Sequence, residues 1–258
     1  MPKLRSLSPS QCAELIQYAH FIVALTGAGI STSAGIPDFR GPRGLYVTRR
    51  YDPDKVFEIG AFNRAPQHFY EFSNDFVAEV KNVQPTLTHK VLAELERQGP
   101  LAGVITQNID QLHQLAGNQK VVELHGSYGA ALCQSCGRRF KDLSYGWWEQ
   151  TMNDSVTPPV AHCSKCTGVI KPDIVFFGEQ VNGYEKAERM VSECDLLLVL
   201  GSSLQVTPAS ILPYSTEATT LVINQGPVAL PPASHRYFID GDLDRYFGQV
   251  AACLGEGS

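Results

Sequence analysis

The stretch FIVALTGAGIS, residues 21–31, is the strongest indicator of the fold in this chain. The run from Phe21 to Thr26 is almost wholly apolar, which is typical of a strand buried on both faces of a parallel sheet. Gly27 and Gly29 follow it, and glycines at this place let the backbone approach a pyrophosphate closely. The N–H groups at the start of the next helix can then bind the negative charge of the pyrophosphate. The match to a dinucleotide-binding fingerprint is partial, because Thr32 stands where Gly or Ala is usual. A tight turn between strand and helix is therefore the alternative interpretation.

Further short apolar runs indicate strands of the same kind, at 102–106, 121–124, 196–200 and 220–223. Helical patterns flank them, at 9–19, 67–80, 89–98, 184–192 and 244–254. Strands that alternate with helices predict an α/β fold with a doubly wound parallel sheet, a Rossmann-like domain.

Two segments do not follow this alternation. Residues 42–85 are rich in aromatic residues, and residues 130–171 hold both tryptophans and four of the seven cysteines. We interpret them as two insertions that together build a smaller helical and zinc-binding domain. Residues 1–41, 86–129 and 172–258 would then form the large domain.

The composition sets limits on partners and compartment. The 258 residues are 43% hydrophobic, which is enough to fill a core, and no run approaches the 18 apolar residues of a membrane span. The net charge of −5 argues against a dedicated nucleic-acid binder, because such proteins need a basic face. The first residues lack the apolar region of a secretory signal. We therefore expect a cytoplasmic protein, and nothing in the sequence demands more than a monomer.

Four cysteines form two CxxC pairs, Cys133 with Cys136 and Cys163 with Cys166. In a reducing compartment such pairs indicate a metal site, and four thiolates suit tetrahedral Zn²⁺. With four protein ligands the site is closed, so we predict a structural role for the zinc. The remaining three cysteines are interpreted as small packing residues: Cys12, Cys194 and Cys253.

Polar residues follow several of the predicted strands, in TQNID (106–110), ELHG (123–126), GSSL (201–204) and NQG (224–226). The carboxyl ends of parallel strands meet at one edge of the sheet, where α/β proteins bind ligands. Of the seven histidines, His125 is the candidate general base, since its usual pKa of about 6.5 suits proton transfer near neutrality. Helix capping by TQNID and a structural histidine are the alternatives.

Two more motifs carry functional signals. GIPDFRG (35–41) places an aromatic, an acid and a cation beside a rigid proline, which predicts a mobile loop with Phe39 able to cover a reactive carbon. A surface turn with a buried phenylalanine is the alternative. KPDIVFFGE (171–179) is extended and apolar, so it is either a core strand or an exposed edge that pairs with a peptide.

Taken together, these motifs resemble the sirtuin family of NAD-dependent protein deacylases, over roughly Leu15 to Leu254. The resemblance rests on seven motifs in order: GAGIS (27–31), GIPDFRG, TQNID, ELHG, the two CxxC pairs, KPDIVFFGE and GSSLQVTPA (201–209). The form of GSSL and the short termini are closer to bacterial or archaeal members than to animal ones.

The resemblance implies a site for each substrate. NAD would lie across the carboxyl edge of the sheet, and the residues that would hold it are Gly27, Ala28, Gly29, Thr32, Asp38, Phe39, Arg40, Gln107, Asn108, Ile109, Asp110, Gly201, Ser202, Ser203, Asn224, Gln225, Asp242 and Leu243. An acetyl-lysine peptide would pair as a strand between the two domains, against Val175, Phe176, Phe177 and Gly178. The acyl oxygen would attack C1′ of the nicotinamide ribose, with His125 as general base and Asn108 orienting the ribose and a water. The products would be free lysine, nicotinamide and an O-acyl-ADP-ribose.

Sirtuins that prefer acidic acyl groups carry a Tyr-x-x-Arg pair that binds the acyl carboxylate. Here Tyr70 is present, but Ser73 stands where the Arg would be. A buried carboxylate without its cation is costly, so the sequence predicts removal of neutral acyl groups.

Two other functions stay open: mono-ADP-ribosyl transfer, and a non-catalytic NAD-binding zinc scaffold. An NAD oxidoreductase is disfavoured by the partial fingerprint and by GIPDFRG. A zinc hydrolase is disfavoured because four cysteines leave no open metal position.

Overall fold

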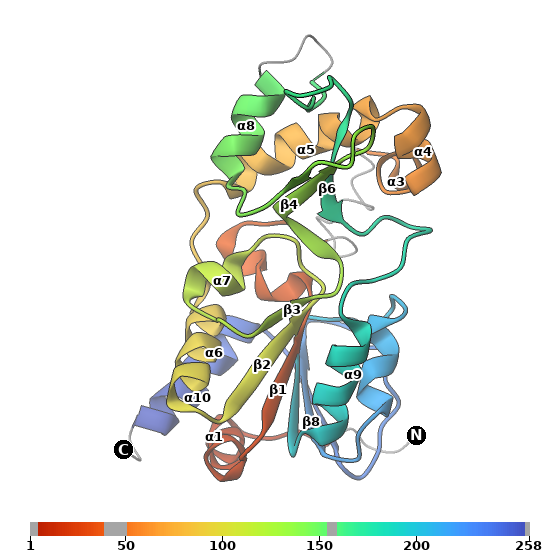
Figure 1. The fold of residues 1–258 in the computed structure, drawn as a ribbon. Coiled ribbons are helices and arrows are strands. Elements are labelled where there is room, and N and C mark those ends of the chain that lie inside the picture. The colour runs from red at the N-terminus through yellow and green to blue at the C-terminus, as the bar shows by residue number, and fades with distance from the viewer. Residues whose placement is uncertain (1–4, 39–50, 154–158, 256–258) are drawn as a thin grey trace.

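The computed structural model describes residues 5–38, 51–153 and 159–255, and these form a large and a small part (Figure 1). The large part contains a six-stranded parallel sheet in the order β3-β2-β1-β7-β8-β9. Its strands are β1 (Ile22–Thr26), β2 (Leu101–Thr106), β3 (Val121–Glu123), β7 (Leu196–Leu200), β8 (Thr219–Asn224) and β9 (Arg236–Asp240). The doubly wound sheet predicted from the apolar runs is confirmed, and its strand order is the one typical of dinucleotide-binding domains.

Both faces of the sheet are buried, as the continuous apolar runs require. In β1, Ile22 and Ala24 belong to one hydrophobic core while Val23 and Leu25 belong to the core on the opposite face. The first core is covered by α1 (Pro9–Tyr18), α6 (Leu87–Gln98) and α10 (Leu243–Gly255). The second is covered by α9 (Tyr184–Glu193) and the 3₁₀ helix η3 (Ala209–Tyr214).

The start of α1 follows the expected capping chemistry. Ser8 accepts the N–H of Gln11, whose side chain in turn accepts the N–H of Ser8, and Pro9 occupies the first turn. The short helix α7 (Leu112–Ala116) lies between β2 and β3. Strand β9 was not predicted, because its residues are only half buried at the sheet edge and form no continuous apolar run.

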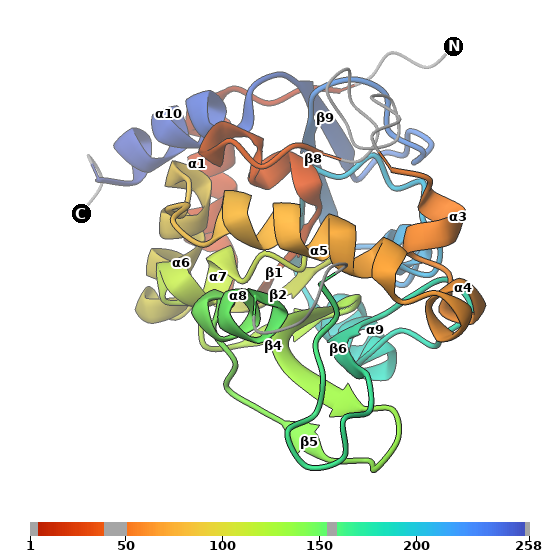
Figure 2. The same ribbon diagram turned by 90° about the horizontal axis from the view of Figure 1, so that it is seen from above.

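The small part joins the two segments that interrupt the alternation (Figures 1 and 2). From the first come α3 (Pro53–Val56), α4 (Ile59–Arg64) and α5 (Gln67–Val80), and from the second α8 (Tyr145–Asn153). A three-stranded antiparallel sheet completes it, in the order β5-β4-β6, with β4 (Gly126–Cys133), β5 (Arg139–Phe140) and β6 (Ile170–Ile174).

One aromatic core holds both segments together. Phe69 and Phe72 of α5, Tyr128 of β4 and Trp148 of α8 are buried in the same cluster, and the Trp148 Nε1–H donates to the Tyr128 carbonyl at 2.8 Å. The small sheet was not predicted, and β4 and β6 run through the expected boundaries at 129/130 and 171/172. The division into two insertions around one large domain remains an interpretation. Among the described helices, none is long and apolar enough to cross a bilayer.

Candidate active site

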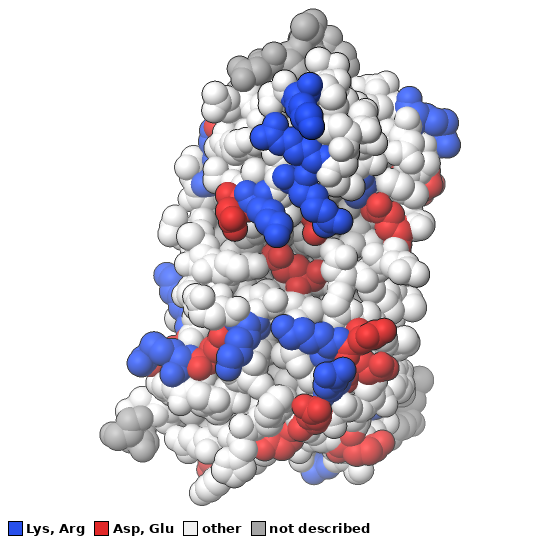
Figure 3. All heavy atoms as spheres, in the orientation of Figure 1, with Lys and Arg blue, Asp and Glu red and all other residues white. Residues whose placement is uncertain are grey.

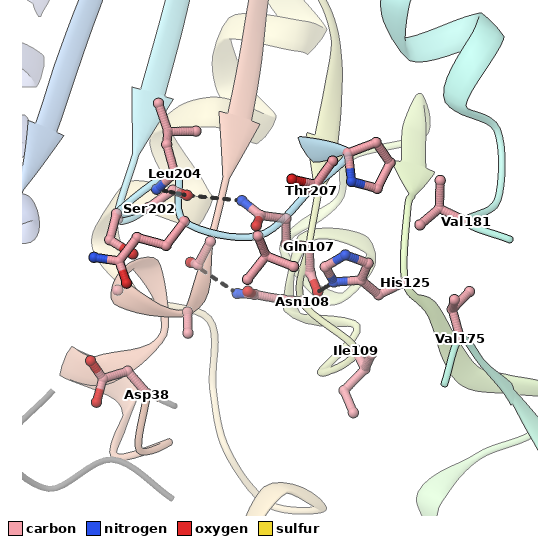
Figure 4. A pocket seen from close by; sticks show the side chains of 18 of the residues that line it. Asp38, Gln107, Asn108, Ile109, His125, Val175, Val181, Ser202, Leu204 and Thr207 are labelled. Atoms are coloured by element: carbon pink, nitrogen blue, oxygen red, sulfur yellow. Dashed lines mark hydrogen bonds between the residues drawn. The ribbon is translucent and has the colours of Figure 1, made fainter. Parts of the chain in front are cut away.

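A cavity of about 1210 Å³ opens at the edge of the large sheet where its parallel strands end. The loops that follow β1, β2, β7 and β8 line it, together with the segment 174–186 that leads from β6 into α9. The strand order reverses between β1 and β7, and open α/β sheets bind their ligands at such a point. Figure 4 shows that polar side chains from these loops share one space with apolar ones.

The loops after β1 and β7 approach each other through glycine. The Gly29 N–H donates to the Gly201 carbonyl at 2.9 Å. A Cβ on Gly29 would lie 2.7 Å from the Gly201 Cα, and Gly201 itself has a φ of +63°. The chain continues in two 3₁₀ helices, η1 (Ala28–Ile30) and η2 (Thr32–Ala34), instead of the α-helix that follows a full fingerprint. The close approach holds this loop at the cavity wall.

Asn108 is fixed by a buried polar network. Its Nδ2 donates to the Gly27 carbonyl and to Ser31 Oγ, each at 3.2 Å. Ser31 donates to Asp110 Oδ2 at 2.6 Å, and Asp110 Oδ1 accepts the Leu112 N–H at 3.0 Å. Burial raises the pKa of Asp110 although these donors counteract it. Among the described residues no donor reaches Asn108 Oδ1, which is therefore available to a ligand or a water.

His125 lines the cavity between the two parts of the molecule (Figure 4). Its Nδ1 lies 2.9 Å from the Gln107 carbonyl. A carbonyl oxygen only accepts, so Nδ1 carries the proton and Nε2 of the neutral ring is the basic atom. Gly126 follows with a φ of +66°, and a Cβ there would lie 1.6 Å from the Asp173 carbonyl. Only glycine therefore lets this chain cross so close to the segment that leads to Val175.

The motif KPDIVFFGE divides into a strand and an extended edge. After β6 ends, the Val175 N–H donates to the His125 carbonyl at 2.9 Å. The Phe177 N–H donates to the Phe57 carbonyl at 2.7 Å, and the Phe177 carbonyl accepts the Ile59 N–H at 3.1 Å. Within the described ranges, the Val175 carbonyl has no donor. An unpaired acceptor in a cavity wall suits pairing with an extended peptide.

The four cysteines predicted to bind zinc converge at one end of the small part, and their sulfurs all lie within 4.8 Å of one another. The Sγ atoms of Cys133 and Cys166 are 3.5 Å apart, and those of Cys136 and Cys163 are 3.9 Å apart. Tetrahedral zinc with Zn–S bonds of about 2.3 Å places its sulfurs about 3.8 Å apart. Hydrogen bonds from backbone N–H groups, of Cys136 and Lys165 respectively, lower the pKa of the Cys133 and Cys163 thiols, whereas contacts with the other cysteines raise the pKa of Cys166 to about 12. The cluster fits one structural zinc.

Lys and Arg gather on the small part in the face shown in Figure 3, whereas both signs are mixed on the large part. Arg138, Arg139, Lys141 and Lys165 flank the two CxxC pairs in the sequence. Four thiolates around Zn²⁺ carry a net negative charge. The neighbouring cations offset this charge.

Tyr70 and Ser73 do not line the cavity. Tyr70 is fully buried and its hydroxyl donates to the Ile170 carbonyl. Ser73 Oγ accepts the Tyr128 hydroxyl at 3.0 Å. Both side chains are therefore engaged in the core of the small part.

The cavity brings together nearly all the residues expected to bind NAD or peptide. Asp110 is the exception, because it lies behind the wall in the Asn108 network. Phe39 and Arg40 lie outside the described residues. The predicted residues that line the cavity are Gly27, Ala28, Gly29, Thr32, Asp38, Gln107, Asn108, Ile109, His125, Val175, Phe176, Phe177, Gly178, Gly201, Ser202, Ser203, Asn224, Gln225, Asp242 and Leu243.

Several lining residues were not predicted from the sequence. One of them lies in the turn between α3 and α4, and the others lie in or directly after known motifs: Phe57, Glu179, Gln180, Val181, Leu204, Gln205, Val206 and Thr207. The last four lie within the motif GSSLQVTPA, so their position in an assigned motif was the signal that could have identified them. Phe57 has no such signal, because only the fold places it at the cavity.

Comparison with known families and sequences gives a consistent result. The family model described as the Sir2 family matches residues 27–208. The chain is 38% identical to NAD-dependent protein deacetylase 2 of Caldanaerobacter subterraneus, over 82% of this chain and 83% of the relative. It is 42% identical to NAD-dependent protein deacetylase 1 of Pyrobaculum aerophilum, over 83% of this chain and 82% of the relative.

Solved structures agree with these matches. A structure reported on the mechanism and regulation of Sir2 enzymes superposes with a TM-score of 0.85 at 34% identity, over 97% of this chain and 99% of that one. A Sir2 structure with a deacetylated p53 peptide and 3′-O-acetyl ADP-ribose gives the same TM-score and identity, over 95% and 98%. These similarities agree with the resemblance found in the motifs.

Proposed function

The chain belongs to the Sir2 family, and we propose that it is an NAD-dependent protein-lysine deacetylase. The observation that carries the proposal is the convergence, in one cavity at the switch point of the sheet, of the basic His125 Nε2, the fixed amide of Asn108 and the unpaired carbonyl of Val175. Relatives named as deacetylases support the same activity.

The cavity wall offers a place for each portion of NAD. Ala28 and Thr32 would lie at the pyrophosphate, Asp242 and Leu243 at the adenine, and Ile109 at the nicotinamide. The polar residues that would hold the riboses are Gln107, Ser202, Ser203, Asn224 and Gln225. Gln107 Nε2 donates to Ser202 Oγ at 2.9 Å, which fixes two of these side chains before the ligand enters.

Bound NAD supplies an electrophilic ribose carbon from which nicotinamide departs and to which the acyl oxygen of the substrate adds. An amide oxygen is a weak nucleophile, so the protein must hold it in place and exclude water. Ile109, Val175 and Phe177 supply apolar walls beside His125. His125 Nε2 would accept a proton from a ribose hydroxyl, while Asn108 Oδ1 would orient the ribose and the attacking water.

The peptide would enter as an extended strand between the two parts of the molecule. The Val175 carbonyl would accept the N–H of the acyl-lysine side chain. Phe177, a residue that is 51% exposed, would pack on the aliphatic stem of that lysine. Binding through peptide backbone would allow many different protein substrates.

The test of this function is a mass-spectrometric assay of an acetyl-lysine peptide with and without NAD. We expect NAD-dependent loss of the acetyl group and release of nicotinamide. ADP-ribosyl transfer would instead leave label from NAD on a protein and keep the acetyl group on the peptide. A scaffold would bind NAD and consume none.

The acyl preference gives a separate prediction. Succinyl-peptide should be turned over at least about tenfold more slowly than acetyl-peptide, because the sequence has Ser73 in place of the Arg of the Tyr-x-x-Arg pair and so lacks the cation that would pair with a buried acyl carboxylate. Comparable kcat/KM for acetyl- and succinyl-peptides of one sequence would contradict this. The variant Ser73→Arg is not a suitable probe, because Ser73 is buried against Tyr128.

The pH profile gives another prediction. Burial lowers the pKa of His125 below its usual 6.5, although the hydrogen bond to the Gln107 carbonyl counteracts it. The neutral base therefore predominates at pH 7. We expect kcat/KM for peptide to stay constant between pH 8 and about pH 6.5, and to decrease at lower pH as His125 becomes protonated. A rate that already halves between pH 8 and pH 7 would exclude His125 as the titrating base.

The setting of the protein completes the proposal. We place it in the cytoplasm, acting as a monomer on acetylated proteins and without direct contact to nucleic acid. The net charge of −5 suits lysine-bearing, basic peptides better than nucleic acid.

A further inference from the structure

We propose that buried Lys171 and Glu179, which lies at the cavity wall, form an ion-paired clamp that positions the Val175 carbonyl for the acyl-lysine side chain. The two residues act on the peptide through the backbone and not on the reacting atoms. This inference rests on the proposed deacetylase function, because it concerns the peptide side of that cavity.

Lys171 is a cation with little access to solvent, and its side chain is 9% exposed. Its Nζ lies 2.9 Å from Glu179 Oε2 and donates to the Ile174 carbonyl at 2.8 Å. The same Nζ lies 4.2 Å from the centre of the Phe176 ring, within the range of a cation–π contact. A buried ammonium group is costly unless such partners surround it, so the arrangement is closely constrained.

Glu179 holds the backbone on the other side of Val175. Its Oε2 accepts the Phe176 N–H at 2.8 Å while it also pairs with Lys171. The ion pair therefore holds the Ile174 carbonyl and the Phe176 N–H, which are the backbone groups on either side of Val175.

The third backbone constraint comes from the side of His125. The Val175 N–H donates to the His125 carbonyl at 2.9 Å, which ties the peptide edge to the candidate general base. The backbone around Val175 is thus held on three sides, and its carbonyl is the group left without a donor among the described residues. Small displacements of a positioned group reduce rates strongly, so loss of the clamp should weaken peptide use.

Steady-state kinetics of Glu179→Gln, Lys171→Met, Lys171→Arg and the double variant Lys171→Met/Glu179→Gln tests the clamp. We expect kcat/KM for acetyl-peptide to fall by about tenfold or more in the two charge-removing variants, mainly through the KM for peptide. The KM for NAD should stay within about twofold. Lys171→Arg should restore most of the activity, and the double variant should be no worse than the poorer single one.

A matched control is the double variant Lys81→Met/Glu149→Gln, which removes an ion pair between α5 and α8 that does not reach the cavity. It should keep the native KM for peptide. Circular dichroism at the assay temperature checks folding. Glu179→Gln keeps the size of the side chain, so its result stands even if Lys171→Met does not fold.

The outcomes separate the two proposals. A native protein that does not deacetylate the peptide would contradict the proposed function. If the native protein is active and the folded Glu179→Gln variant has the native KM for peptide, the clamp is overturned while the proposed function stands. An equal rise in the KM for NAD would also overturn it, because that would indicate a general distortion of the cavity.

Discussion

His125→Ala is expected to abolish deacetylation while the affinity for NAD stays within about twofold of the native value. The ring offers its Nε2 to the cavity because Nδ1 is engaged with the Gln107 carbonyl. Removing a positioned general base costs about 10²- to 10⁴-fold in rate. NAD binding survives because the loops that line the rest of the cavity do not depend on this side chain.

The measurement is free lysine formed in the peptide assay, beside NAD binding by calorimetry. His20→Ala is the matched control, because His20 is exposed at the turn before β1 and does not line the cavity. It should behave as the native protein. A His125→Ala enzyme that keeps more than about a tenth of the native rate would remove the histidine from the mechanism.

Loss of the zinc is expected to unfold the small part and to stop activity indirectly. Cys133 and Cys163 are nearly inaccessible and belong to the same core as Phe72, Trp148 and Ile109. Structural zinc contributes apparent free energies of about 10–16 kcal/mol in small domains at pH 7, which is of the order of a whole domain's stability. The four-cysteine cluster therefore secures a core that this part could not otherwise maintain.

The effect reaches the active site through contacts of Tyr145 and Ile109. Tyr145 of α8 donates its hydroxyl to the Ile109 carbonyl at 3.3 Å, and the Ile109 side chain packs in the core of the small part. Ile109 follows Asn108 directly in the chain. Disordered packing around the zinc would therefore release the loop that holds the candidate catalytic amide.

Tryptophan fluorescence reports this event selectively, because both tryptophans of the chain, Trp147 and Trp148, lie in α8. A strong chelator, or Cys163→Ala, should shift their emission to the red while helices of the large part persist in circular dichroism. Cys253→Ala, which alters a partly buried cysteine of α10, should leave emission and activity unchanged. Native emission from protein shown to be free of zinc would contradict a structural role.

The sequence was informative where a single physical requirement acts on neighbouring residues. A strand buried on both faces must be apolar throughout, so β1, β2, β7 and β8 could be located from their residues alone. Zinc needs four close thiolates, so the two CxxC pairs were sufficient to predict the cluster. Gly126 could be expected beside His125, although the carbonyl of Asp173 that requires it could not.

Contacts between distant segments were beyond sequence reasoning. The half-buried β9 and the two-residue β5 have no periodic pattern long enough to indicate a strand. Phe57 reaches the cavity only because the chain at 57–59 pairs with Phe177. KPDIVFFGE was interpreted as an extended apolar segment, and the pairing of Lys171 with Glu179 at its two ends depends on how the chain between them turns.

The most direct test of the central claim is the stoichiometry of one reaction. Acetyl-lysine peptide and NAD are incubated with the protein, and free lysine peptide, nicotinamide and O-acetyl-ADP-ribose are quantified together by mass spectrometry. The account predicts that the three appear in equal amounts and that none forms without NAD. Release of acetate without consumption of NAD, or consumption of NAD with the peptide still acetylated, would contradict it.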